Sequence, residues 1–154
     1  MNTIDLDIAN RVECILETWG TTGNGMPSEK TWQIIAGTSQ DQRLTLVNFF
    51  KFRDRAAYPA SYTEGDTDIS GEEAFQRYAK ISMPSLEQVG GRFLMVAPFC
   101  KTFIGADQDW DLVAIGSYPS QTALLALFEL EEYRKAYVHR VAACAEQTVS
   151  LCLG

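Results

Sequence analysis

The sequence LTLVNFFKFR at positions 44–53 predicts a β-strand, because it is rich in strand-forming residues and lies between polar segments. Alternate side chains of a strand point to opposite faces of its sheet. One face of this strand carries Leu46, Asn48, Phe50 and Phe52, so the amide of Asn48 lies among apolar groups. The other face carries Val47, Phe49, Lys51 and Arg53. Both faces are partly apolar, so we expect both to be covered in the folded protein.

The segments that follow this strand predict an α+β domain over residues 41–154. After a long polar loop, Ser70 and Glu73 form a capping box that starts a helix, and Gly90-Gly91 ends it. Strands are predicted at 92–101, with an extension over 103–104, and at 111–118, joined by a hairpin turn at 107–109. Helices at 120–127 and 131–143 and a last strand at 148–153 complete the order β-α-β-β-α-β. This order is typical of the ferredoxin-like sandwich, whose helices cover one face of the sheet.

Residues 1–40 are expected to form a helical extension in front of that domain. Apolar residues at helical spacing predict a helix over 5–18, and a second helix over 28–36 follows Pro27. The glycine-rich run GTTGNG at 20–25 indicates a flexible linker between the two helices.

The face of the predicted sheet that no helix covers still carries valine, phenylalanine, leucine and methionine. An apolar face of this kind is unfavourable in water, and twofold dimers are the commonest oligomers. We therefore expect a homodimer that pairs through its sheet to form a dimeric α/β barrel.

Composition and charge restrict the partners and the compartment. The chain has 154 residues and a formal net charge of −7, and no cluster of lysine and arginine offers a face to nucleic acid or to an anionic membrane. No segment approaches the ~20 apolar residues of a membrane helix, and the acidic N-terminus does not resemble a secretory signal. The four cysteines form no CxxC pair, so we expect reduced thiols in a cytoplasmic protein, with a Cys144–Cys152 disulfide as the alternative.

The chain also resembles the family known as domain of unknown function 1330. The matching stretches are short and follow one another along residues 28–154: VNFFKFR at 47–53, AYP at 57–59, SGEEA at 70–74 with Tyr78, GGR at 90–92, WD at 110–111, YPS at 118–120, EY at 132–133 and HR at 139–140. The resemblance implies a dimeric α+β barrel. It implies no activity, because this family has no settled reaction and the scaffold hosts many functions.

Polar residues within or beside the apolar strands are the candidates for ligand binding. Asn48 lies among phenylalanines, where a buried amide either contacts a ligand or braces neighbouring backbone. Arg53 ends the first strand and Arg92 begins the second, and a guanidinium at either place binds a carboxylate or pairs with a loop acid. Further candidates are two tyrosines and a tryptophan, which either line the pocket or pack in the core or a dimer contact, at Tyr78, Tyr118 and Trp110.

Two residues are candidates for acid–base catalysis. His139 is the only histidine, and its imidazole titrates near neutral pH. Asp111, at the start of the third strand, is a candidate general base. The alternatives are a solvent-facing or capping histidine and an aspartate that holds an arginine or caps a turn. His139 is also a candidate axial ligand of haem.

These features favour a homodimer with a small-molecule pocket between its sheet and its helices. As an enzyme, it is expected to act without a cofactor, by proton transfer, isomerisation or oxygenation of a small organic substrate. A non-catalytic binding or assembly module and a haem-binding protein are the alternatives. No metal site is predicted, because one histidine and four scattered cysteines match none of the common zinc-binding spacings.

Overall fold

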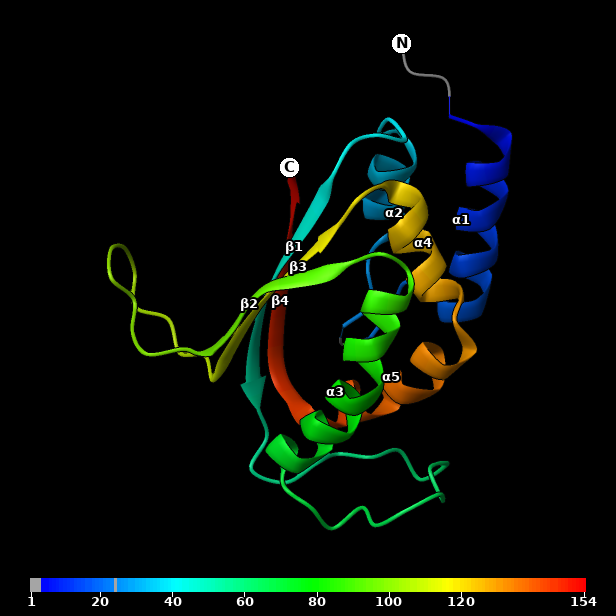
Figure 1. Ribbon diagram of the computed structural model, residues 1–154. Coiled ribbons are helices and arrows are strands. Elements are labelled where there is room, and N and C mark those ends of the chain that lie inside the picture. Colours follow the sequence, from blue (N-terminus) through cyan, green and yellow to red (C-terminus); the bar gives the residue numbers. More distant parts are fainter. Residues whose placement is uncertain (1–3, 24) are drawn as a thin grey trace.

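The computed structural model describes residues 4–23 and 25–154, which form an α+β structure with a four-stranded antiparallel sheet and five helices (Figure 1). The elements follow in the order α1 (Leu6–Trp19), α2 (Glu29–Ala36), β1 (Leu44–Phe52), α3 (Gly71–Gln88), β2 (Arg92–Pro98), β3 (Leu112–Tyr118), α4 (Gln121–Glu129), α5 (Glu131–Ala143) and β4 (Cys144–Leu153). Both predicted N-terminal helices and the strand at 44–53 are confirmed to within about two residues.

The capping box predicted at the start of α3 is confirmed. The Ser70 hydroxyl accepts the Glu73 N–H at 3.0 Å, and the Glu73 carboxylate accepts the Ser70 N–H at 3.3 Å. These bonds satisfy two N–H groups that a helix start otherwise leaves without partners. They fix the place where the chain leaves the polar loop and crosses the sheet.

The strands lie in the order β2-β3-β1-β4, and every neighbouring pair is antiparallel. The register places Val96, Ala114, Asn48 and Val149 in one row across the sheet. All five helices lie on one side of the sheet (Figure 1). The side chains of this row therefore share the face that the helices cover.

The N-terminal helices pack on the other helices and leave the second face of the sheet uncovered (Figure 1). The buried face of α1 consists of Ile8, Val12 and Ile15. Trp19 donates its indole N–H to the carbonyl of Phe128 at 2.9 Å, which ties α1 to the end of α4. Residues before β1 thus thicken the helical layer.

Two predicted boundaries differ from the structure. Strand β2 ends at Pro98, and residues 99–111 form a loop that projects away from the helices, so the predicted strand extension at Phe103-Ile104 is not formed (Figure 1). These two side chains are 98% and 87% exposed and have no neighbouring strand to pair with. Strand β4 begins at Cys144, four residues earlier than predicted, because this segment pairs with the end of β1 across an irregularity at Lys51-Phe52. None of the described helices combines the length and the apolar composition needed to cross a membrane.

Candidate functional site

An interior cavity of about 390 Å³ lies between the helix-covered face of the sheet and helices α2 to α5. This volume lies within the range of small-molecule sites. Three half-exposed side chains line it where it reaches the surface, namely Met83, Val96 and Val149. The helices contribute mostly aromatic and aliphatic groups, including Trp32, Tyr78, Leu86, Phe128, Tyr133 and Tyr137.

Small residues on β3 create the space. The helix-facing positions of this strand are Leu112, Ala114, Gly116 and Tyr118, so its centre offers a methyl group and a bare backbone. A Cβ built on Gly116 would lie 3.4 Å from the Leu86 side chain, which is ordinary van der Waals contact. The centre of the sheet therefore leaves space beneath the helices, which larger side chains at these positions would fill.

Arg140 brings a charge into this cavity. Its residue is 7% exposed, and its Nε donates to Gln147 Oε1 at 2.8 Å. Its Nη1 donates to the Tyr78 hydroxyl at 3.2 Å, and its Nη2 donates to Asn48 Oδ1 at 3.4 Å. Its guanidinium carbon lies 4.8–5.6 Å from the ring centres of Phe50, Tyr137 and Tyr78.

The surroundings of Arg140 are neutral. It is the only charged residue among the described residues that line the cavity, and it forms no ion pair with a described carboxylate. Burial raises the pKa of Tyr137 to about 12 and also raises the pKa values of Tyr118 and Tyr133. These phenols are therefore protonated at neutral pH and supply no negative charge to balance the guanidinium.

Two further contacts connect the linker before α2 to the cavity. The Tyr137 hydroxyl donates to the Gly25 carbonyl at 2.5 Å, and the backbone of Gly25 passes close to the Gln147 amide. Trp32 on α2 is buried against Phe128, with their ring centres 4.9 Å apart. In the part of the chain that the structure describes, the Trp32 indole nitrogen is the one buried side-chain nitrogen or oxygen without a hydrogen-bond partner.

Three of the residues expected to bind a ligand line this cavity together: Asn48, Tyr78 and Tyr118. The Asn48 amide donates to the carbonyls of Ala114 at 3.0 Å and Leu46 at 3.3 Å, so it braces backbone while its oxygen faces Arg140. The Tyr78 hydroxyl lies 3.0 Å from that of Tyr133 and accepts from Arg140. These contacts join β1, α3 and α5 through one polar cluster.

The other expected ligand-binding residues lie outside the cavity lining. Arg53 and Arg92 are exposed, at the end of β1 and the start of β2. Trp110 packs against Phe49 with ring centres 5.7 Å apart and donates to Gln108, on the loop before β3. The structure thus separates both arginines from Asn48 and Tyr78.

The two candidate acid–base residues also lie away from the cavity and from each other. The Asp111 carboxylate accepts the backbone N–H of Phe52 at 2.7 Å and lies 3.7 Å from Lys51 Nζ. His139 points to the β1–α3 loop, where its Nδ1 lies 2.7 Å from the Tyr58 hydroxyl. His139 and Arg140 are adjacent on α5, but the first contacts the β1–α3 loop and the second lines the cavity.

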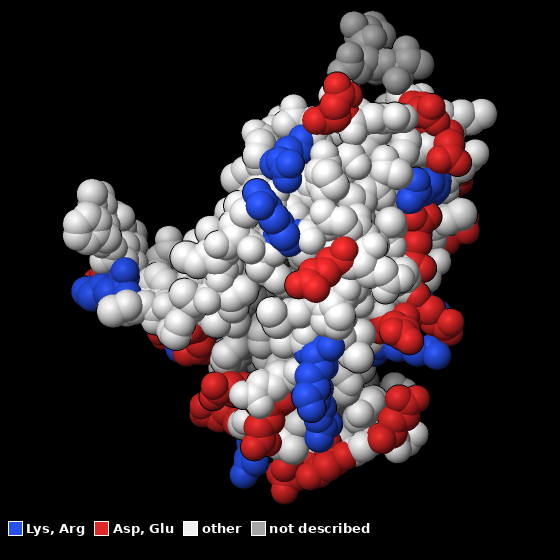
Figure 2. Space-filling model, viewed as in Figure 1, with Lys and Arg blue, Asp and Glu red and all other residues white. Residues whose placement is uncertain are grey.

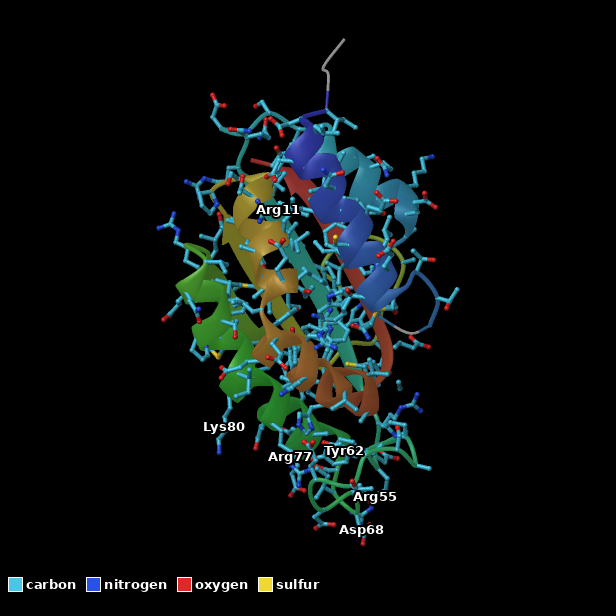
Figure 3. The ribbon with its side chains drawn as sticks, turned by 90° about the vertical axis from the view of Figure 1, so that its right-hand side faces the viewer. Arg11, Arg55, Tyr62, Asp68, Arg77 and Lys80 are labelled. Atoms are coloured by element: carbon cyan, nitrogen blue, oxygen red, sulfur yellow. The ribbon has the colours of Figure 1, made fainter. Side chains whose placement is uncertain are left out.

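The surroundings of His139 favour its neutral form. Tyr58 and Tyr62 stack on each other with ring centres 4.6 Å apart, and His139 meets both rings edge-on. Arg77, which lies beside Tyr62 in Figure 3, donates to the Tyr58 oxygen at 3.4 Å and to the Asp66 carbonyl at 2.7 Å. Burial, followed by the positive charge of Arg77, lowers the pKa of His139.

The surface carries more acid than base. Figure 2 shows acidic side chains gathered at the end of the molecule that holds the β1–α3 loop, with no broad basic area on the face shown. Within residues 4–23 and 25–154, no group of three or more histidine, cysteine or acidic side chains is arranged to hold a metal ion.

The sequence interpretation missed Arg140, Tyr137 and Gln147 as site residues, although each lines the cavity. A helical spacing was present that indicates Arg140: Tyr133, Tyr137 and Arg140 recur at intervals of four and three and share one face of α5. Charged residues are usually exposed, so an arginine on the aromatic face of a helix is an unusual feature that can be noticed in the sequence.

The fold and family are supported by known proteins. A family model described as a domain of unknown function (DUF1330) matches residues 60–152. The chain belongs to the DUF1330 family. This confirms the family resemblance found in the sequence. No curated protein matches the chain.

Solved structures extend the similarity beyond the matched part of the DUF1330 domain. The RPA0582 protein of unknown function from Rhodopseudomonas palustris is 28% identical with a TM-score of 0.74, and the match covers 86% of this chain and 98% of that one. A second structure, of methylated RPA0582 protein, has the same identity and TM-score and is covered over 96% of its length. Neither is described with an activity, so these similarities support the fold and the family and assign no function.

Proposed function

We propose that this protein is a homodimer that binds a small organic molecule in the cavity between its sheet and its helices. The single observation that carries this proposal is the cavity of about 390 Å³ with buried polar groups set into aromatic walls. Two donors at its wall, on Arg140 and Trp32, have N–H groups that no described residue accepts. Buried donors are normally satisfied, and a bound molecule would satisfy them.

We propose Asn48, Tyr78 and Tyr118 as residues that contact this molecule, with Arg140 added to them. We assign no reaction and no cofactor. His139 and Asp111, the expected acid–base residues, take no part in the proposed binding.

We further assign the fold to the ferredoxin-like arrangement and the dimer to its helix-free sheet face. The strand order β2-β3-β1-β4 and the two β-α-β halves support the first assignment. The second is supported by apolar side chains on the uncovered face, at Val47, Phe49, Met95, Val113 and Ile115. Met95 is the most exposed of these five side chains, at 42%.

A pair of isoleucine substitutions on β3 tests the binding proposal. Ala114→Ile adds volume inside the cavity, whereas Val113→Ile adds a methylene on the opposite face of the same strand. In a thermal-shift screen of small organic compounds, we expect hits that stabilise the wild type and Val113→Ile but not Ala114→Ile. Hits that stabilise all three proteins equally would place binding elsewhere, and a wide screen without any hit would refute the proposal.

A further inference from the structure

We infer that the molecule bound in this cavity is an organic monocarboxylate with an aromatic or branched apolar body, and that Arg140 binds its carboxylate. The inference rests on the proposed function, because it specifies the ligand of the same cavity. It replaces the exposed Arg92, which the sequence suggested as the anion-binding residue, with a buried arginine on α5.

Arg140 carries a buried positive charge that no described residue neutralises. A guanidinium stays protonated at any physiological pH, and a buried charge is normally paired with an opposite one. Arg140 instead meets an amide oxygen on Asn48, another on Gln147 and the Tyr78 hydroxyl. These three bonds use three of the five N–H groups that an arginine carries, so two N–H groups remain for which no described residue is an acceptor.

The number of charges decides between classes of anion. Arg140 is the only charged residue among the described residues at the cavity wall, so one negative charge balances it. A carboxylate carries one charge and accepts two parallel N–H bonds from a guanidinium fork. A phosphate dianion would leave an unbalanced negative charge among aromatic rings, where desolvation is costly.

The cavity walls indicate the chemistry of the rest of the ligand. Apart from the polar cluster around Arg140 and the hydroxyl residues Ser28, Thr31 and Ser82, the cavity is surrounded by rings and aliphatic groups, including Trp32, Phe75, Leu86, Phe93 and Phe128. Water fills about 30 Å³ per molecule, so the volume holds roughly a dozen groups of that size. A carboxylate attached to a ring or a short branched chain fits both this volume and the apolar surface.

Matched pairs of acids and amides test the inference on the full chain. We would measure affinities by titration calorimetry for phenylacetate, 3-phenylpropionate and 4-methylpentanoate, each beside its primary amide. The amide keeps the shape and removes the charge. We expect each acid to bind roughly tenfold or more tightly than its amide, because charge-assisted bonds are about twice as strong as neutral ones.

Variants of two arginines on α5 locate the effect. Arg140→Gln and Arg140→Met should remove the preference for the acid, and Arg140→Lys should restore part of it because the charge returns. Arg134→Gln, on the exposed side of the same helix, is the control and should bind as the wild type does. Circular dichroism of each variant checks folding, and Arg140→Met keeps an unbranched apolar side chain that suits the cavity.

The outcomes distinguish a failure of this inference alone from a failure of the proposed function. Acids and amides that bind equally well, and that are both lost in Ala114→Ile, would leave the cavity as a binding site and overturn the role of Arg140. Acid binding that persists in Arg140→Gln would overturn it as well. If neither series binds the wild type, both the inference and the proposed site fail for molecules of this size.

Discussion

Arg140 brings a permanent charge into an interior where no other described residue balances it. Moving a guanidinium out of water costs several kcal/mol even after the protein relaxes, and the amide and phenol oxygens around it return only part of that. Aromatic faces at 4.8–5.6 Å contribute further attraction. An apolar residue would fill the same space at lower cost, so the arginine is better explained by a ligand than by stability.

His139 is a residue whose charge state affects stability in a direction that follows from its contacts. Arg77 donates to the Tyr58 oxygen, which leaves the Tyr58 hydroxyl hydrogen available to bond to an unprotonated Nδ1 of His139. Protonation would place a second cation next to Arg77 and break this bond. The lowered pKa of His139 reflects burial first and Arg77 second.

We therefore predict that acid weakens the fold through His139. Its pKa in the folded protein lies below the unfolded value of about 6.5, so the unfolded chain binds more protons between the two values. The contribution of His139 to stability is complete above pH ~6.5 and is lost as the pH falls through the folded pKa.

Melting temperatures of the wild type and His139→Gln, measured from pH 8 to pH 5, test this prediction. The difference between the two proteins should shrink as the pH falls below about 6.5. Because the chain contains a single histidine, its imidazole resonance gives the folded pKa directly by nuclear magnetic resonance. A folded pKa at or above 6.5 would contradict the expectation.

Among the elements, the linker between α1 and α2 contributes Gly25 to the cavity wall. Gly25 in this linker has a φ of +87°, a region that side chains rarely adopt, and a Cβ there would lie 2.5 Å from the Gln147 amide nitrogen. Gln147 in turn accepts from Arg140. A side chain at position 25 would therefore disturb the polar cluster from outside the sheet.

We predict that Gly25→Ala lowers the free energy of unfolding by about 1–3 kcal/mol and weakens ligand binding. Gly23→Ala is the matched control, because Gly23 also has a positive φ of 102° but nothing lies within 4 Å of its Cβ position. Urea titrations of both variants separate backbone strain, which they share, from the contact with Gln147, which Gly25→Ala alone creates. Equal losses in the two variants would show that this contact is unimportant.

The elements that could be predicted from the sequence are those with a strong local signal. The strand from Leu44, the capping box at Ser70 and the helix over 131–143 each combine composition with a clear boundary. The start of β4 could not be read in this way, since Cys144–Gln147 contains few strand formers and is held by its pairing with β1. Phe103 and Ile104 show the reverse, because their strand propensity is high but no partner strand exists.

The same limit applies to the site. Asn48 and Tyr118 could be predicted at the cavity because each lies in a mostly apolar strand, and Tyr78 because it lies on the apolar face of its helix. Arg140 could not be separated from exposed arginines, because charge on a helix usually faces solvent. The spacing of Tyr133, Tyr137 and Arg140 places Arg140 on the aromatic face of its helix, but its burial also depends on the register that brings Asn48 and Gln147 under α5.

For the whole molecule, the main question is what lies against the uncovered face of the sheet. Val47 and Ile115 are register partners at its centre, and Phe49 and Val113 are partners beside them. Helices α1 and α2 pack on the opposite side and leave these residues uncovered, and on this face the Trp110 ring packs against Phe49 (Figure 1). The loop between β2 and β3 projects on this same side of the sheet (Figure 1), and its sequence includes the exposed Phe103 and Ile104.

A second copy of the chain is the occupant that we propose, and a charge at the centre of the face tests it. A stable interface needs about 800 Å² from each partner, and the sheet face and the projecting loop are the surfaces that we propose for it. Ile115→Glu would bury an unpaired carboxylate in this interface, and we predict that it converts a dimer into a folded monomer. Ile34→Glu, at a 51% exposed position on α2, is the control and should leave the dimer intact. Sedimentation velocity at micromolar concentration measures both variants, and a monomeric wild type or a dimeric Ile115→Glu would rule out pairing through the sheet.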